Sequence, residues 1–569
     1  MNLTEWFIFF IGIQVLHFLG TWRLYISAGR KLWEASIPIY NAIVLMKIIN
    51  RPTWWVILLF IPVINLIMII IIWIETIRSF GKNSNTETAL VVFSLGLYII
   101  FLNYSQNIEY IKDRRLTSKT SFGEWMSSMM FAIIAATLVH TYFIQPFIIP
   151  TGSLEKSLLI GDFLFVSKFH YGARIPSTAI STPMVHDTLP IIRTRSYLKY
   201  PQFPYMRFPG FEKIKRNDIV VFNWPADTVR QFFVKEKGVR KPIDKKSNYV
   251  KRCIAIAGDT LQIKDGIVYI NGQKNILPEW AKIQHTYIAY SSQGISSRKL
   301  IKLGFNDFNR VYKISNITQA KYRSLVPYII GSKGNTVEDF VVITPSKGLS
   351  IDLVKRLDLK IAELKVQSKE INSTYEKIQI LKKQDWIDSI KRNISFVKTP
   401  NENFFPNRIT FDWNEDNFGP IVIPKKGARI KLERETYPLY KKVIEEYEKT
   451  KVIREPNVFK IDNRITDNYT FKQNYYWMMG DNRHRSEDSR VWGFVPEDHV
   501  MGKPVFIWMS IENFNDGIRN WKIRWDRVFS KVNGKGKRVS YLPHFIVFLI
   551  LIQFYSYIRK KIKNKKSRI

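Results

Sequence analysis

A serine followed three residues later by a lysine is the first candidate for nucleophilic chemistry in this chain. Ser153 and Lys156 lie in the stretch IPTGSLEKSL, residues 149–158. A serine hydroxyl is a weak nucleophile until a base removes its proton, and a neutral lysine amine can act as that base. A second lysine, Lys251, lies far along the chain in YVKRCIAIAGD, residues 249–259. Both patterns indicate acyl transfer through a serine, with two lysines as candidates for the base.

The surroundings of the two lysines favour Lys251. At its usual pKa of about 10.4, a lysine is neutral in roughly one molecule in 2,500 at pH 7, so an effective base needs an apolar environment. Alternation predicts a strand in which Tyr249, Lys251 and Cys253 share one face, with no acidic residue near Lys251 in sequence. Lys156 follows Glu155 in a turn that we expect to stay hydrated, and both conditions favour the charged amine.

Two more stretches complete a set of four in a fixed order. RNDIVVF covers residues 216–222, and MGDNRHRSEDSRVWGFVPEDHVMGKP covers residues 479–504. Together with PTGS and YVKRCIAIAGD, they resemble the type I signal peptidases, membrane-bound Ser/Lys enzymes that remove signal peptides from exported proteins. That family's serine box reads approximately PSGSMxPTLxxGD, its lysine box YxKRxxxxxGD and its last box GDNRDNSxDSRxWGxVP. The resemblance covers residues 146–275 and 470–510.

The resemblance implies a role for individual residues. Ser153 corresponds to the nucleophile and Lys251 to the general base. The hydroxyl of Thr151 and the backbone N–H of Ser153 correspond to an oxyanion hole, which stabilises the charge of a tetrahedral intermediate. Three residues of the last box correspond to positions that orient the base and shape the site: Ser486, Asp488 and Arg490. The implied enzyme is a signal peptidase I, a serine endopeptidase that needs no cofactor and no metal.

The chain departs from the family pattern at three places. Leu154 stands where the family has methionine, and Lys156-Ser157 stands where it has Pro-Thr, so both changes bear on the shape of the site. His484-Arg485 replaces Asp-Asn in the last box. A histidine there suggests a His-based triad, but the family chemistry needs none, and we assign His484 no catalytic role.

Apolar runs predict a multi-span membrane protein. Five runs approach the roughly 20 residues of a bilayer-spanning helix: Trp6–Trp22, Trp54–Ile74, Ala89–Tyr104, Trp125–Ile144 and Leu542–Ile558. A shorter run, 37–49, is interrupted by polar residues and predicts an interfacial or re-entrant segment. The positive-inside rule places the N-terminus outside, residues 105–122 and 559–569 inside, and about 146–540 outside a bacterial inner membrane, on its periplasmic side. Arg78 and Lys82 fall on the wrong side of this scheme.

The predicted fold is a mainly β catalytic domain of antiparallel sheets, with a large α/β insertion and several transmembrane helices. Alternation predicts strands at 161–168, 217–222, 249–257 and 266–271, the last followed by an Asn-Gly turn. Apolar residues spaced three to four apart predict one long helix or helical hairpin over 351–390, and 176–209 predicts an extended connector. The predicted domains are a membrane region 1–122, an anchor 123–145, a catalytic domain 146–274 and 466–540, an insertion 275–465, and a C-terminal transmembrane helix with a basic cytoplasmic tail, 541–569.

Composition narrows the partners. The net charge of +38 favours an anionic membrane surface over nucleic acid, because the basic residues are scattered and no nucleic-acid module is present. A single cysteine excludes an intramolecular disulfide and CxxC motifs, and the histidines show no metal-ligand spacing. The resemblance to the signal peptidases adds preprotein signal peptides and the protein translocation machinery to membrane lipids as expected partners.

Three alternatives compete with this interpretation. A self-cleaving Ser/Lys repressor would carry a DNA-binding domain and lack membrane segments, the reverse of this chain. Ser153-Leu154-Glu155-Lys156 matches the S-x-x-K motif of penicillin-binding proteins, but the SDN-like and KTG-like partners are absent at credible spacing. A non-catalytic membrane scaffold stays open because of the large insertion.

Overall fold

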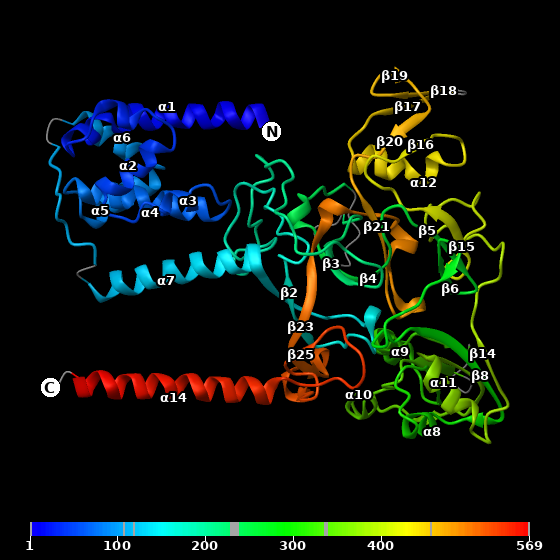
Figure 1. Ribbon diagram of the computed structural model, residues 1–569. Coiled ribbons are helices and arrows are strands. Elements are labelled where there is room, and N and C mark those ends of the chain that lie inside the picture. The colour runs from blue at the N-terminus through cyan, green and yellow to red at the C-terminus, as the bar shows by residue number, and fades with distance from the viewer. Residues whose placement is uncertain are drawn as a thin grey trace.

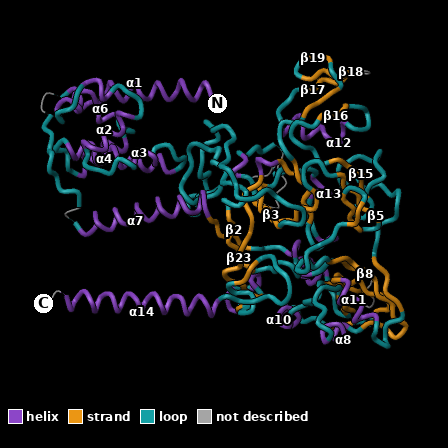
Figure 2. The backbone as a smooth tube through the Cα atoms, in the orientation of Figure 1, coloured by secondary structure: helices purple, strands orange, loops and turns teal. Residues whose placement is uncertain are grey.

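The computed structural model describes residues 3–105, 108–117, 120–227, 238–334, 340–455 and 458–566. Most long helices gather at one side of the molecule and most strands at the other, as Figure 1 and Figure 2 show. The helices before the first strand are α1 (Leu3–Ser27), α2 (Tyr40–Ile48), α3 (Trp55–Leu58), α4 (Ile64–Ser79), α5 (Asn85–Phe93), α6 (Leu97–Tyr104) and α7 (Ser121–Leu138). The chain ends in α14 (Leu542–Lys566), which extends from the strand-rich part toward the side of these helices (Figure 1).

Three helical segments in the described part of the chain are long and apolar enough to cross a membrane. They are Leu3–Ser27, Ser121–Phe143 and Leu542–Arg559, and their apolar side chains are almost entirely unburied by the rest of the protein. A helix of about 20 apolar residues spans the hydrocarbon core, and its outward side chains are then covered by lipid. These three segments confirm the first, fourth and fifth predicted apolar runs as candidate spans.

The predicted runs at 54–74 and 89–104 are both interrupted: 54–74 is not among the candidate spans of the described residues, whereas Asn85–Phe93 and Leu97–Tyr104 could form one span only as a bent pair. The first run divides into α3 and α4 around Pro62, which cannot continue a regular helix, and Val63 takes a left-handed φ of 71°. The second run bends by 116° between α5 and α6. Gly96 makes that bend with a φ of +85°, and a Cβ there would lie 2.6 Å from the Trp73 ring. Both runs therefore fold, together with α2, into one helical unit.

A buried carboxylate joins distant parts of this helical unit. Glu75 pairs with Arg51 at 2.9 Å, with Arg78 at 3.9 Å and with Arg114. The structure thus places Arg78 beside Arg51 and Arg114, whereas the sequence scheme had put it on the opposite side of the membrane. The reason is that residues 54–74 do not form one continuous helix. The chain therefore turns back within the helical unit, and α4 brings Arg78 to the same end of the unit as Arg51.

The largest sheet carries all four sequence boxes and is antiparallel. Within the described residues it has nine strands, in the path β1-β2-β23-β3-β4-β21-β22, with β24 and β25 pairing with β23. The strands are β1 (Ile144–Ile148), β2 (Asp162–Ser167), β3 (Ile219–Asn223), β4 (Asn248–Ala255), β21 (Tyr475–Met479), β22 (Val495–Pro496), β23 (Val500–Glu512), β24 (Lys522–Ile523) and β25 (Ser530–Lys531). The predicted mainly antiparallel β fold is confirmed, as are the predicted strands that became β2, β3 and β4.

Smaller antiparallel sheets lie between β4 and β21 along the chain. One has the order β15-β5-β6-β7, where Asn271 and Gly272 form the predicted turn between β6 and β7 with left-handed φ angles. The others have the orders β13-β8-β14, β10-β11-β9-β12, β16-β20 and β17-β18-β19. Their strands are β5 (Thr260–Lys264), β6 (Ile267–Ile270), β7 (Gln273–Lys274), β8 (Gln284–Ile295), β9 (Arg310–Ile314), β10 (Gly331–Lys333), β11 (Phe340–Thr344), β12 (Ile361–Glu363), β13 (Val366–Thr374), β14 (Ser389–Arg392), β15 (Phe418–Val422), β16 (Arg429–Lys431), β17 (Val452–Glu455), β18 (Val458–Ile461), β19 (Arg464–Ile465) and β20 (Asn468–Thr470). The short helices are α8 (Ser297–Lys302), α9 (Gln319–Leu325), α10 (Ile351–Arg356), α11 (Tyr375–Lys382), α12 (Tyr437–Lys442) and α13 (Ser489–Trp492).

The prediction of a long helix over 351–390 is wrong. The segment contains α10, β12, β13, α11 and β14 in succession. Asp358 leaves the helical region with a φ of 46°, and Ile371 then lies buried on β13 opposite Tyr287 of β8. Apolar residues three to four apart fit a helix, but short helices and strands in succession can produce the same spacing.

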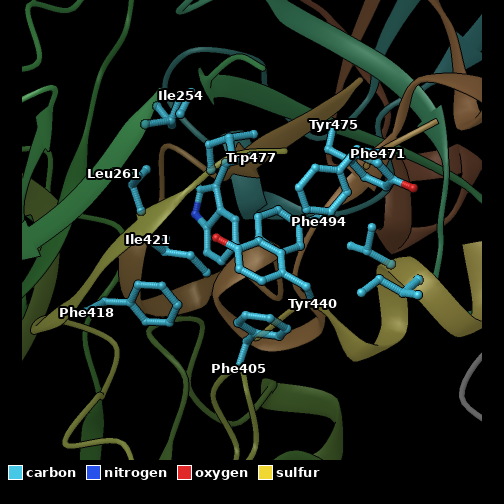
Figure 3. Close-up of a cluster of buried hydrophobic side chains, with 14 of the residues drawn as sticks. Ile254, Leu261, Phe405, Phe418, Ile421, Tyr440, Phe471, Tyr475, Trp477 and Phe494 are labelled. Carbon is cyan, nitrogen blue, oxygen red and sulfur yellow. The ribbon is translucent and has the colours of Figure 1, made fainter. Parts of the chain in front are cut away.

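A cluster of aromatic and aliphatic side chains holds β21 in place. Trp477 of β21 is fully buried, and its ring lies 5.3 Å from that of Phe418 and 5.5 Å from that of Phe494 (Figure 3). Strands β4, β5 and β15 contribute further members of the cluster. Because such close packing resists displacement, the C-terminal end of β21 has a fixed position. Gly480 of the last sequence box follows β21 directly.

Candidate active site

The candidate nucleophile lies on a short 3-10 turn, Gly152–Leu154, between β1 and β2. The backbone N–H of Asn482 donates to the Ser153 carbonyl at 3.0 Å, and the Asn482 side chain donates to the Gly152 carbonyl at 3.2 Å. Thr151 precedes the turn in an extended conformation and is exposed. The serine loop is thus bonded directly to the loop that follows β21.

Lys251 lies on β4 and is almost fully buried, with 3% of its surface exposed. Its amine nitrogen lies 5.6 Å from the centre of the Tyr249 ring on the same face of the strand. Burial lowers the pKa of Lys251 to about 8, although the carboxylates of Asp488 and Glu487 act in the opposite direction. These two acidic neighbours could not be identified from the sequence, because they reach Lys251 only through the fold.

The register of the sheet brings the two halves of the site together at Gly480. Arg252 of β4 pairs with Met479 of β21, so one step along this antiparallel pair sets Lys251 beside Gly480. A Cβ on Gly480 would lie 2.6 Å from the Ser153 carbonyl and 2.2 Å from the Ser486 hydroxyl. Ser153, Lys251 and Ser486 therefore surround one glycine. The described contacts include no side-chain hydrogen bond between Ser153 and Lys251.

Ser486 has a buried hydroxyl without a hydrogen-bond partner among the described residues. Buried polar groups normally have partners, and an unpartnered one marks a place where a substrate or a moving side chain can bind. A cavity of about 310 Å³ lies beside Ser486, between the last box and residues of β13 and the segment after β14.

Asp488 and Arg490 form a buried ion pair with two contacts, both of 2.9 Å. Asp488 also accepts a hydrogen bond from the backbone N–H of Gly480 at 3.0 Å. Burial alone would raise the pKa of Asp488, but the adjacent Arg490 guanidinium outweighs it and lowers that pKa. The predicted pair is therefore present, and it fixes the backbone at the point where β21 ends.

A second buried ion pair was missed from the sequence. Arg252 donates to Asp481 at 2.8 Å through Nε, and both side chains are almost completely buried. The Ser157 hydroxyl donates to the same carboxylate at 2.6 Å, which ties the serine loop to the last box a second time. Alternation placed Arg252 on the face away from Lys251, but it could not show that both faces of β4 are covered.

Both residues that depart from the family's last box contact the segment between β7 and β16. His484 accepts from the Thr286 backbone N–H at 3.0 Å through Nδ1 and donates to Asp416 at 3.0 Å through Nε2. This pattern of one acceptor and one donor fits the neutral imidazole. Arg485 forms an ion pair with Asp307. Neither residue contacts Ser153 or Lys251 in the described part of the chain.

A lowered pKa alone does not single out Lys251. Burial also lowers the pKa of Lys168 to about 7, and that of Lys246 and of Lys369 to about 8. Lys156, the other candidate base, lies in a turn with a φ of 72°, and its amine donates to Asn306 at 3.1 Å. Of these lysines, all within the described residues, Lys251 is the one whose strand pairs with β21 next to Gly480, so position rather than pKa distinguishes it. Among the described residues there is no group of three or more His, Cys, Asp or Glu that could hold a metal ion.

Comparisons with known proteins match two parts of the chain. The family model described as "Signal peptidase, peptidase S26" matches residues 122–293 and 422–509, and a "Family of unknown function (DUF5684)" matches residues 33–113. The signal peptidase I of Buchnera aphidicola from Schizaphis graminum is 24% identical over 70% of this chain and 78% of its own length. That of Buchnera aphidicola from Acyrthosiphon pisum is 24% identical over 72% and 82%. That of Rickettsia massiliae is 30% identical over 28% of this chain and 46% of its own length.

Proposed function

Because the chain belongs to the type I signal peptidases, we propose that it removes signal peptides from exported preproteins with a Ser153/Lys251 dyad. One observation carries this proposal. Lys251 is buried and has a pKa lowered to about 8, and its strand position follows the Arg252–Met479 pair, next to the glycine against which the Ser153 carbonyl packs. A base of that pKa is neutral in roughly one molecule in ten at pH 7, against one in 2,500 for free lysine.

The proposed reaction runs through an acyl-enzyme. Lys251 takes the proton of the Ser153 hydroxyl while that oxygen attacks the carbonyl of the scissile peptide bond. The negative oxygen of the tetrahedral intermediate is stabilised by the Ser153 N–H and the Thr151 hydroxyl. The new amino terminus leaves with the proton from Lys251. Water then attacks the ester while Lys251 accepts its proton, and Lys251 returns that proton to the Ser153 oxygen as the bond to the acyl group breaks and the carboxyl product leaves.

The supporting residues fit this reaction as positioning groups. We assign to the unpartnered Ser486 hydroxyl the task of aiming the Lys251 amine. The Asp488–Arg490 pair holds the backbone of Gly480 through its hydrogen bond, and so fixes the wall between base and nucleophile. Preprotein signal peptides are the proposed partners, together with membrane lipids and the translocation machinery.

Substrate choice tests the proposed activity. Type I cleavage sites carry small residues such as alanine immediately before the cut and two residues earlier. Purified protein in detergent is expected to cleave a preprotein that has alanine immediately before the cut. When phenylalanine replaces this alanine, cleavage is expected to be at least about tenfold slower, since a small pocket tolerates overpacking poorly. Product formation by mass spectrometry measures both rates. Equal rates for the two substrates would exclude the proposed specificity.

The apolar helices and the relatives indicate a membrane-anchored protein, and we propose a multi-pass arrangement in a bacterial plasma membrane. The start of α1, the end of α7 and the start of α14 all lie at the end nearer the strands (Figure 1). The catalytic domain is proposed to lie on the periplasmic side. The Glu75 cluster, with its three arginines, is proposed to lie at the cytoplasmic end.

Cysteine labelling tests this topology. A cysteine at the exposed Asn271 is expected to react with a membrane-impermeant maleimide in intact spheroplasts, and one at Lys82 only after permeabilisation. The native Cys253 is buried and gives little background. Labelling at Lys82 in intact spheroplasts would contradict the revised topology and restore the one derived from the sequence.

Residues 275–465 are proposed to be an inserted subdomain that braces the site. The family model leaves 294–421 unmatched, and Asp307, Asn372 and Asp416 of that segment all reach the last box. Asn372 donates to Asn482 at 2.9 Å, and Asn482 in turn holds the Ser153 carbonyl. His484 and Arg485, the two residues that depart from the family's last box, make two of these contacts, and the backbone N–H of Gln284 donates to the Asp481 carbonyl as well.

Charge exchange tests the brace. Arg485→Asp is expected to lower kcat about tenfold, because Asp307 then repels the loop that carries Ser486. Asp307→Arg in the same protein is expected to restore most of that loss, with KM nearly unchanged throughout. A double variant as slow as Arg485→Asp alone would show that the pair does not position the loop.

A further inference from the structure

A cavity of about 170 Å³ lies where the span that contains α7 ends, and it shares no lining residue with the cavity beside Ser486. The hairpin β1–β2, the stretch 174–186 and residues 244–245 form its walls, and Val63 of the helical unit reaches it. Its charged and titratable lining residues are His140, Lys168, Arg174, His186, Asp244 and Lys245.

The charges that line the cavity are not balanced. Lys168 donates to the Thr141 carbonyl at 3.1 Å, and Arg174 donates to the Asp498 carbonyl at 2.6 Å and to the Asn223 side chain at 2.7 Å. Within the described residues, no carboxylate oxygen lies within the 4.0 Å salt-bridge distance of Lys168, Arg174 or Lys245.

The only carboxylate among the lining residues is already engaged. Asp244 accepts hydrogen bonds from the hydroxyls of Ser177 and Thr178, at 2.7 and 2.8 Å, and from the Thr178 backbone N–H. The lining thus holds three basic side chains, Lys168, Arg174 and Lys245, and one carboxylate, while Asp187 and Asp498 outside the lining act on Lys245 and Arg174 from a distance.

Burying a cation without a counter-ion is unfavourable, and the lysines show this cost. Burial lowers the pKa of Lys168 to about 7, and Arg174 adds to the effect. Burial also lowers the pKa of Lys245. A bound anion would supply the missing charge and restore the protonated amines.

The surroundings of the cavity are suited to a membrane surface. The candidate span Ser121–Phe143 contains His140 near its end, so the cavity lies where the apolar part of the helix stops. The adjoining stretch 184–211 exposes several large apolar side chains, among them Ile191, Ile192, Leu198, Tyr200, Phe208 and Phe211. Exposed apolar side chains gathered in one segment are typical of a membrane contact. In Figure 1 this stretch lies between the helical unit and the strands.

We propose that this cavity binds the phosphate group of an anionic phospholipid, taken from the leaflet on the side of the catalytic domain. Lys168 and Lys245 are its charged donors, and the half-buried Arg174 adds to the positive field. A phosphate offers several acceptor oxygens to such donors. The apolar stretch 184–211 selects a lipid over a free ion, because it sits beside the acyl chains while the headgroup enters the cavity.

The test uses the full-length protein in a neutral detergent and measures the midpoint of thermal unfolding. Short-chain phosphatidylglycerol is expected to raise the midpoint of the wild type by about 3 °C or more, and short-chain phosphatidylcholine is not. A variant with Lys168→Gln and Lys245→Gln is expected to lose the shift. The matched control, with the exposed lysines Lys264→Gln and Lys274→Gln, is expected to keep it.

Three results would overturn the proposal or its lipid. No shift of the wild type, or an equal shift in the Lys168/Lys245 double variant, would overturn the cavity as the site. Inorganic phosphate that shifts the wild type as far as the lipid does would overturn the lipid as the source. Without lipid, the double variant is expected to melt no lower than the wild type, since it loses two unpaired buried charges. If the double variant melts lower than the wild type, the single Lys245→Gln variant replaces it in the test. That variant is expected to lose at least half of the lipid-induced shift in the unfolding midpoint. The readout involves no peptide cleavage, so it is independent of the Ser/Lys mechanism.

Discussion

Lys251→Ala and Ser153→Ala are each expected to reduce preprotein cleavage by roughly 10⁴-fold or more while the protein stays folded. Ser153 supplies the attacking oxygen and Lys251 removes its proton, so neither change leaves a group that can replace the missing one. Lys251→Ala also removes a buried amine rather than an apolar core side chain, and we expect thermal unfolding to change little. Initial rates on a purified preprotein and a melting curve measure the two effects separately.

Lys156→Ala is the matched control for this prediction. It removes the lysine of the S-x-x-K pattern, whose amine is hydrogen-bonded to Asn306. The variant is expected to keep most of the activity. An inactive Lys156→Ala together with an active Lys251→Ala would refute the assignment of the base and favour the penicillin-binding type of chemistry.

The pH profile follows from the same assignment. A base acts in its neutral form, so the rate is present above the pKa of Lys251 and is lost as the pH falls below it. With that pKa at about 8, kcat/KM is expected to rise about tenfold per pH unit below it and to level off above it. A rate still climbing at the same slope near pH 10 would point to a lysine that is not buried.

Much of the active region could be predicted from the sequence because its signals are local. Alternation predicted β2, β3, β4 and β6, and the Asn-Gly pair predicted the turn after β6. The pairing of Arg252 with Met479, which brings Lys251 toward Gly480, could not be predicted, since it depends on the register between strands more than 200 residues apart. For the same reason Asp488 escaped notice as a neighbour of Lys251, and so did the Arg252–Asp481 pair.

The errors have physical causes that differ from one another. Pro62 and Gly96 were visible breaks inside two apolar runs, but the length and hydropathy of the runs outweighed them in the prediction. In 351–390 the signal was ambiguous in itself, because the alternation of Lys369, Ile371 and Ser373 was hidden within a spacing of three to four. The carboxylate partners of His484 and Arg485, Asp416 and Asp307, lie in a segment that the family model leaves unmatched, so the family pattern could not supply them.

Gly480→Ala is expected to lower kcat by about 100-fold or more. The added Cβ would lie 2.2 Å from the Ser486 hydroxyl, 2.5 Å from the Ser486 Cβ and 2.6 Å from the Ser153 carbonyl oxygen. Ordinary contacts are about 1 Å longer, so the serine loop and the last box must move apart by about that much, and a misplacement of about 1 Å can cost around 10²-fold in rate.

Gly331→Ala is the control for this change. A Cβ added to Gly331 would have no heavy atom within 4 Å, and this glycine has no left-handed φ, so the same methyl group has space there. It is expected to leave kcat unchanged. Gly480→Ala also overpacks a buried site and is expected to lower the free energy of unfolding by about 1–3 kcal/mol, so rates are to be measured below its melting temperature. A folded Gly480→Ala enzyme with wild-type kcat would show that Ser153 and Ser486 do not close on this glycine during the reaction, and the wall between nucleophile and base would have to be sought elsewhere.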